Sequence, residues 1–75
     1  MTKLPVIRDK DLLRALKRLG FVEARQRGTS HLVLKHPDGR MATVAIHPGK
    51  DIPRGTLRAI LRDIKITPDE FMRSL

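Results

Sequence analysis

The chain has 75 residues and no cysteine, so we expect a single small domain over residues 1–75, with neither disulfides nor thiolate-bound metal. Lysine and arginine outnumber aspartate and glutamate by 16 to 8, and the formal net charge of +8 favours a phosphate-rich partner such as nucleic acid. The two phenylalanines are its only aromatic residues besides histidine, which argues against RNA binding by base stacking on exposed rings.

Hydropathy indicates where the protein works. No stretch of the sequence is apolar for long enough to form a signal-peptide core or a membrane span. We therefore expect a soluble, cytoplasmic protein that does not bind membranes. Charge alone leaves open a generic basic domain, such as one bound to the ribosome or to an acidic protein.

Apolar residues recur at helical spacing near the N-terminus and predict an amphipathic helix that begins at Arg8 or Asp9 and ends at Gly20. Its apolar side consists of Leu12, Leu13, Leu16 and Leu19. Asp9 suits the electropositive first turn of a helix, and glycine is the residue type that ends helices in a left-handed conformation.

Three extended segments follow, at residues 21–27, 31–36 and 41–47, and predict an antiparallel meander. Residues 28–30 are expected to close the first hairpin, and Asp38 with Gly39 to form a two-residue turn in the second.

These turns predict which side chains face each other across the sheet. The expected pairs are Lys35 with Ala42, Val33 with Val44, His31 with Ile46, Arg27 with His31, Arg25 with Val33, and Glu23 with Lys35. An open face then carries Glu23, Arg25, Arg27, His31 and Lys35. The face under the helices carries Val22, Ala24, Leu32, Leu34, Thr43 and Ala45. Val33, Val44 and Ile46 are apolar on the open face, so either they form a protein-contact patch or the register differs by one residue.

A second helix is predicted from about Arg54 to Ile64, because Leu57, Ile60, Leu61 and Ile64 recur at helical spacing and Pro53 suits its start. Its other side carries Arg54, Arg58 and Arg62. Such a stripe is either an ordinary solvated helix face or a track for phosphates.

Near the C-terminus, residues 67–70 read as a capping box with proline at the first helical position. They predict a short closing helix with Phe71, Met72 and Leu75 facing inward.

The order of the predicted elements indicates the fold class. Helix, three-stranded antiparallel meander and helix form an α+β sandwich of the double-stranded-RNA-binding type, with two helices on one face of the sheet and a short C-terminal helix added. Fold alone does not define function.

Five blocks of sequence carry a family resemblance. They are LKRLGF at residues 16–21, RQRGTSH at 25–31, HPDGR at 36–40, VAIH at 44–47 and KDIPRGTLRAIL at 50–61. In this order they resemble the HicA (YcfA-like) toxins of bacterial and archaeal toxin–antitoxin systems, over roughly residues 9–64.

The resemblance implies an mRNA interferase, an endoribonuclease that cleaves messenger RNA and inhibits translation until a HicB-type antitoxin neutralises it. The essential histidine of the family follows a Gly-Ser pair and corresponds to His31. Here Gly28 lies one residue further back, and Leu32 stands where a second histidine would follow. Since the antitoxin usually carries the DNA-binding part in such systems, DNA contact by this chain is expected to be indirect.

RNA cleavage without metal needs an acceptor for the 2′-hydroxyl proton, a donor for the leaving 5′-oxygen and cations beside the charged phosphorane. Histidine titrates near neutral pH and suits the proton transfers, so His31 is the candidate general acid or base. The candidate RNA-binding residues are Arg25, Arg27, Lys35, His47, Lys50, Arg54 and Arg58. The third histidine, His36, is expected to stabilise the neighbouring turn. The histidines lack metal-ligand spacing, so neither a metal nor another cofactor is expected.

Two other functions fit the same residues. The chain could be a non-catalytic module that binds double-stranded RNA through the arginine stripe while His31 is passive. It could also be an inactive family member that only binds an acidic protein.

Overall fold

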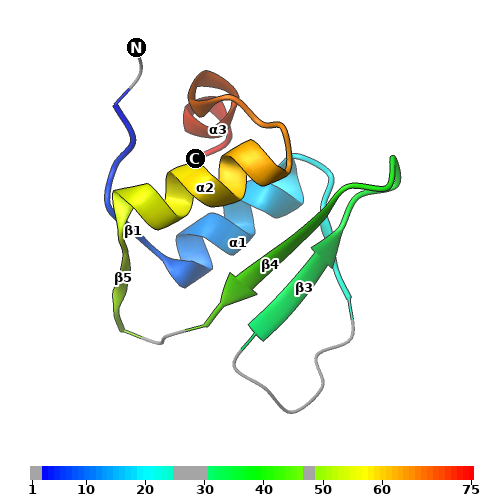
Figure 1. The fold of residues 1–75 in the computed structure, drawn as a ribbon, viewed down its shortest axis with the longest axis horizontal. Coiled ribbons are helices and arrows are strands. Elements are labelled where there is room, and N and C mark those ends of the chain that lie inside the picture. Colours follow the sequence, from blue (N-terminus) through cyan, green and yellow to red (C-terminus); the bar gives the residue numbers. More distant parts are fainter. Residues whose placement is uncertain (1–2, 25–30, 47–48) are drawn as a thin grey trace.

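A three-stranded antiparallel sheet, in the order β2-β3-β4, carries helices α1 and α2 on one side (Figure 1). The computed structural model describes residues 3–24, 31–46 and 49–75. Within them the elements are β1 Ile7–Arg8, α1 Asp9–Arg18, β2 Val22–Glu23, β3 His31–Lys35, β4 Met41–Ala45, β5 Asp51–Ile52, α2 Arg54–Asp63 and α3 Pro68–Ser74. The expected α+β order and the meander are confirmed.

The first helix follows its sequence pattern closely. Leu12, Ala15 and Leu16 are buried in the core, whereas the basic residues of α1 are exposed. The backbone N–H of Gly20 donates to the Lys17 carbonyl and that of Phe21 to the Leu16 carbonyl, which is a Schellman motif. Gly20 has φ of +101°, so the predicted left-handed helix end is confirmed.

The β3–β4 hairpin has a longer turn than predicted. The N–H of His36 donates to the Arg40 carbonyl at 2.9 Å, and the N–H of Gly39 donates to the His36 carbonyl at 2.9 Å. Residues 37–39 therefore form a three-residue loop, with Gly39 at φ of +102° as such loops require. His31 pairs with Ala45 and Lys35 with Met41, so the expected pairing with Ile46 and Ala42 is wrong by one residue.

This shift exchanges the two faces of β4, because alternate side chains of a strand point to opposite sides. The buried face carries Leu32, Leu34, Ala42 and Val44. Thr43 is exposed and Ala45 half-buried, so their expected place under the helices is wrong, and so is the expected open position of Val44. The alternative that the register differs by one residue is the one that holds.

The β2–β3 pairing also differs from expectation. Val22 pairs with Lys35, and Glu23 pairs with Leu34 rather than with Lys35. Val22 is 64% exposed instead of buried, and Ala24 is half-buried. The Glu23 carboxylate lies 3.1 Å from the Lys17 ammonium of α1. The expected pairs of Arg25 and Arg27, and the loop at residues 28–30, lie outside the described residues.

The C-terminal helices confirm most of their predictions. Leu57, Leu61 and Ile64 are buried. The capping box is present, with the Glu70 N–H donating to the Thr67 hydroxyl at 3.1 Å. In α3 only Phe71 points inward as expected; Met72 and Leu75 are 37% and 45% exposed, and Ser74 is buried instead, with its hydroxyl donating to the Phe71 carbonyl.

A two-stranded ladder was not predicted. In it Ile7 of β1 pairs with Ile52 of β5, which ties the segment before α1 to the segment before α2. Both isoleucines join the core. None of the described helices has the length and apolar character that crossing a membrane requires.

Side chains from the β3–β4 turn fasten this hairpin to the helices. The Arg40 guanidinium donates to the Ile64 carbonyl at 2.8 Å and lies 5.3 Å from the centre of the Phe21 ring. His36 meets the same ring edge-on, with 5.0 Å between the ring centres. Its Nδ1 accepts the Asp38 N–H at 3.1 Å, which confirms the expected turn-stabilising role of His36.

We expect Gly20→Ala to destabilise the protein by more than about 1 kcal/mol, because a side chain at this left-handed position is strained. The added Cβ would also lie 2.8 Å from Nε2 of His36. The matched control is Gly55→Ala in α2, whose Cβ meets nothing within 4 Å. It should leave stability unchanged or raise it by up to about 1 kcal/mol. Urea unfolding of both variants measures the difference, and equal effects would contradict this account.

The turn also predicts a pH dependence. Backbone and side-chain hydrogen bonds from Arg40 hold the pKa of the Asp38 carboxyl below its ordinary value. The ionised carboxylate therefore stabilises the fold at pH values above the pKa that Asp38 has in the unfolded chain. This contribution is lost as the pH falls through the pKa that Asp38 has in the folded protein. Asp38→Asn should be less stable than wild type at neutral pH, and the difference should shrink on acidification in urea unfolding. Asp63→Asn serves as a control, and a difference that is constant with pH would count against the assigned role.

Candidate active site

His31 begins β3 on the face of the sheet that the helices leave open. The side chain is exposed, while the next residue, Leu32, is buried under the helices. Strand alternation and the burial of Leu32 and Leu34 therefore direct His31 outward. The predicted position of His31 on the open face is confirmed.

Lys35 lies on the same face at the other end of β3 and is exposed. Four residues of extended chain separate the Cα atoms of His31 and Lys35 by about 13 Å. This separation suits Lys35 to the phosphate of a neighbouring nucleotide rather than to the one beside the imidazole.

Between and around these two residues the open face is mostly apolar. Val22, Lys35 and Met41 form one row across the three strands, and Val33 with Thr43 forms the next row along the β3–β4 hairpin. Val22 and Met41 are among the most exposed large apolar side chains of the described residues. The face therefore offers apolar surface, with the Lys35 cation between Val22 and Met41 in its end row.

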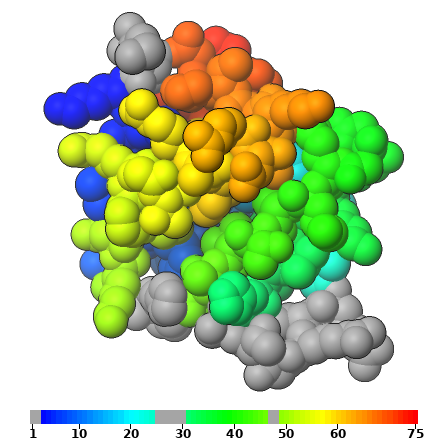
Figure 2. Space-filling view, viewed as in Figure 1, coloured from blue at the N-terminus to red at the C-terminus, as the bar shows by residue number. Residues whose placement is uncertain are grey.

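The remaining candidates for RNA binding are not all brought to this face. Arg25, Arg27 and His47 lie outside the described residues. Arg54 and Arg58 lie on α2, on the opposite side of the sheet from His31 (Figure 1). The Arg54 guanidinium donates to the Leu4 carbonyl at 2.9 Å and so also holds the N-terminal segment. The space-filling view shows α2 forming much of one surface of the molecule (Figure 2).

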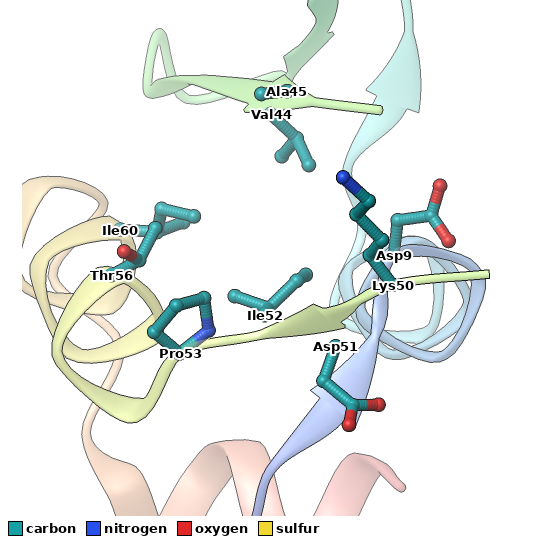
Figure 3. Close-up of a pocket in the computed structure, with 9 residues that line it drawn as sticks. All are labelled: Asp9, Val44, Ala45, Lys50, Asp51, Ile52, Pro53, Thr56 and Ile60. Atoms are coloured by element: carbon teal, nitrogen blue, oxygen red, sulfur yellow. The ribbon is translucent and has the colours of Figure 1, made fainter. Parts of the chain in front are cut away.

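Lys50 lies beside a cavity that the sequence did not predict (Figure 3). This β4–β5–α2 cavity has a volume of about 320 Å³. It is lined by Asp9, Val44, Ala45, Lys50, Asp51, Ile52, Pro53, Thr56 and Ile60. Because these residues come from separate elements, no local sequence signal could have assembled them.

The cavity is mainly apolar with polar groups at its edge. In Figure 3 the Lys50 ammonium extends toward Val44 at the edge of the cavity, whereas the carboxylates of Asp9 and Asp51 point away from its centre. Ala45 links the cavity to the candidate active site, because it lines the cavity and is also the strand partner of His31. In the part of the chain that the structure describes, no three metal-ligating side chains come together.

Comparison with known proteins identifies the family. The family model described as HicA toxin of bacterial toxin–antitoxin systems matches residues 10–66, a span that includes the β2-β3-β4 sheet and α2. No curated protein matches the chain. Because the match covers most of its length, the chain belongs to the HicA toxin family of bacterial toxin–antitoxin systems.

Proposed function

We propose that this toxin is a cytoplasmic endoribonuclease that cleaves messenger RNA without a metal ion, uses His31 as general acid or base, and is neutralised by a HicB-type antitoxin. The observation that supports the proposal is the exposed position of His31 on the sheet face that the described helices leave open, in a HicA-family chain of net charge +8. Any contact with DNA is left to the antitoxin.

The proposed reaction is a transesterification within the RNA backbone. As a base, His31 takes the proton of a ribose 2′-hydroxyl, and the 2′-oxygen then attacks the adjacent phosphorus. The bond from phosphorus to the 5′-oxygen breaks, and this oxygen leaves with a proton from an acid. The products are a 2′,3′-cyclic phosphate and a 5′-hydroxyl, so atoms and charge balance without a metal or a redox partner.

The charge of the chain supports RNA as the substrate. The excess of lysine and arginine attracts the phosphate backbone whatever its sequence, and this attraction weakens with salt. On the open face Lys35 suits the phosphate of a neighbouring nucleotide, which would keep the strand aligned over His31. The apolar side chains around Lys35 suit ribose and base edges.

A second candidate function is passive binding of double-stranded RNA along α2. The observation that favours it is the exposure of Arg58 and Arg62, four residues apart on the helix surface. In that case the open sheet face would not contact RNA, and His31 would have no role in the activity.

His31→Ala should lower the rate of RNA cleavage by about 10²- to 10⁴-fold, because general acid–base catalysis contributes about that much. The measurement is the loss of intact messenger over time with purified protein, in buffer that contains EDTA. Arg73→Ala in α3, exposed and far from the open face in the fold, is the control that should retain activity. Cleavage by His31→Ala at the wild-type rate would refute the catalytic assignment, provided that both variants unfold at the wild-type urea concentration.

Measurements of RNA affinity identify the surface that binds RNA. They use His31→Ala as the background variant, so that the RNA stays intact. If the RNA strand crosses the open face of the sheet, Lys35→Gln should weaken RNA binding and lower the slope of log affinity against log salt concentration by about 1. The double change Arg58→Gln and Arg62→Gln should then leave the slope unchanged. The reverse result, measured by fluorescence anisotropy at several salt concentrations, would favour the passive double-stranded-RNA module.

A further inference from the structure

We propose that the β4–β5–α2 cavity is a nucleotide subsite, which takes the base of a nucleotide next to the cleaved bond and so selects where the RNA is cut. This inference rests on the proposed ribonuclease function and deepens it. It assigns a binding role to Ile52, Thr56 and Ile60, which the sequence analysis had placed in no site.

The dimensions and lining of the cavity fit a planar ring. Its volume of about 320 Å³ lies within the range of small-molecule sites, which are mostly apolar with a few polar groups at fixed positions. Val44 lies on one side and Ile52 with Pro53 on another, while Thr56 and Ile60, one helical turn apart on α2, form a third (Figure 3). Aliphatic walls of this kind hold extruded bases in enzymes that act on nucleic acids.

The composition of the chain favours an apolar cavity over exposed phenylalanine, tyrosine or tryptophan rings for holding a base. Phe21 and Phe71 are the only large aromatic side chains in the sequence, and both are buried in the core. Neither can serve as a platform on which a base stacks, which is the usual way of holding single-stranded RNA. An aliphatic slot is another way to take a base out of water.

The cavity lies on the helix side of the sheet, and an RNA strand bound at His31 on the other face would reach it around the end of β4. Ala45 lines it and is the register partner of His31, and neighbouring strands are about 4.8 Å apart. Because β4 is an edge strand of the three-stranded sheet, nothing from that sheet separates its outer side from β5 and α2. An RNA strand crossing the end of β4 can therefore place one nucleotide at His31 and an adjacent base in the cavity.

Charge at the cavity favours a nucleotide over an uncharged apolar ligand. The Lys50 ammonium extends along the edge of the cavity, in reach of a phosphate whose base occupies the apolar part (Figure 3). The Asp51 carboxylate is directed away and lies 4.0 Å from the Arg8 guanidinium, which offsets its charge. A phosphate would therefore meet a cation at this edge.

Titration with the four nucleoside 5′-monophosphates tests the subsite without cleavage. The titration uses the His31→Ala variant with isotope-labelled isoleucine and valine methyl groups, and NMR records the methyl resonances. We expect saturable shifts at the Ile52 and Ile60 methyls with at least one nucleotide, and no shift at Ile60 with inorganic phosphate. Thr56→Phe, which fills the cavity from the exposed start of α2, should abolish these shifts, and the smaller Thr56→Leu should weaken them.

Lys50→Gln should weaken nucleotide binding about 10-fold, as expected for loss of a charged hydrogen-bond donor. Lys65→Gln removes the same charge just beyond the opposite end of α2 and should have no effect. Absence of saturable shifts with all four nucleotides, or shifts that survive in Thr56→Phe, would overturn the subsite. A cavity that responds only to the antitoxin would be a protein-docking site, and this also would overturn it.

Cleavage of an RNA pool with random bases around the cut separates this inference from the proposed function. The wild type should prefer particular bases at one position beside the cut, and Thr56→Phe should lose that preference. If the wild type cuts and Thr56→Phe keeps the preference, the subsite is wrong and the ribonuclease stands. If the wild type does not cut, the ribonuclease is wrong, and the nucleotide titration alone decides the subsite.

Discussion

The three-residue turn at residues 37–39 is the constraint on which the rest of the molecule depends. A sheet has a side-chain period of two, so this turn decides whether Val44 or Thr43 faces the helices. With Gly39 in its left-handed conformation, Leu34 and Val44 enter the core, and His31 and Lys35 remain on the open face. One turn residue more or less would expose core side chains and bury polar ones. The same local geometry therefore builds the core and presents the candidate active site.

The hairpin is fastened to the helices at one end and presents the candidate catalytic residue at the other. At the turn, Arg40 reaches the end of α2 and the Phe21 ring, while His36 packs against Gly20 where α1 ends. At the far end, β3 begins with His31 and β4 ends with Ala45 at the edge of the cavity. A rigidly held turn keeps the opposite end of both strands in a fixed register. This division explains why two histidines only five residues apart in sequence have different roles, His36 in the fold and His31 at the surface.

Local signals predicted the elements, whereas contacts between elements escaped prediction. The helical periodicity of α1 and α2, Gly20 and the capping box at Thr67 are properties of neighbouring residues, and all were confirmed. The predicted length of the turn was wrong because Asp38-Gly39 is a common two-residue turn sequence. Only the backbone hydrogen bonds of His36 and Arg40 show that Pro37 belongs to the loop. The β1–β5 ladder joins short segments far apart in sequence, so periodicity could not reveal it. The exposed position of His31 was predicted correctly because Leu32 and Leu34 alone determine the faces of β3.

Affinity and selectivity must come from different parts of this molecule. In the proposed function, attraction between the basic chain and RNA acts on phosphates, which are the same at every position, and so it would bring the substrate in without selecting a site. Selection of a site requires contact with bases, and both phenylalanines, the only large aromatic side chains of the sequence, are buried in the core. Shaped apolar surface beside the proposed proton-transfer group, His31, is the feature that can supply this contact. The β4–β5–α2 cavity, joined to His31 through Ala45, is such a surface, and its place across the sheet edge would let the open face bind the backbone while the proposed subsite takes a base.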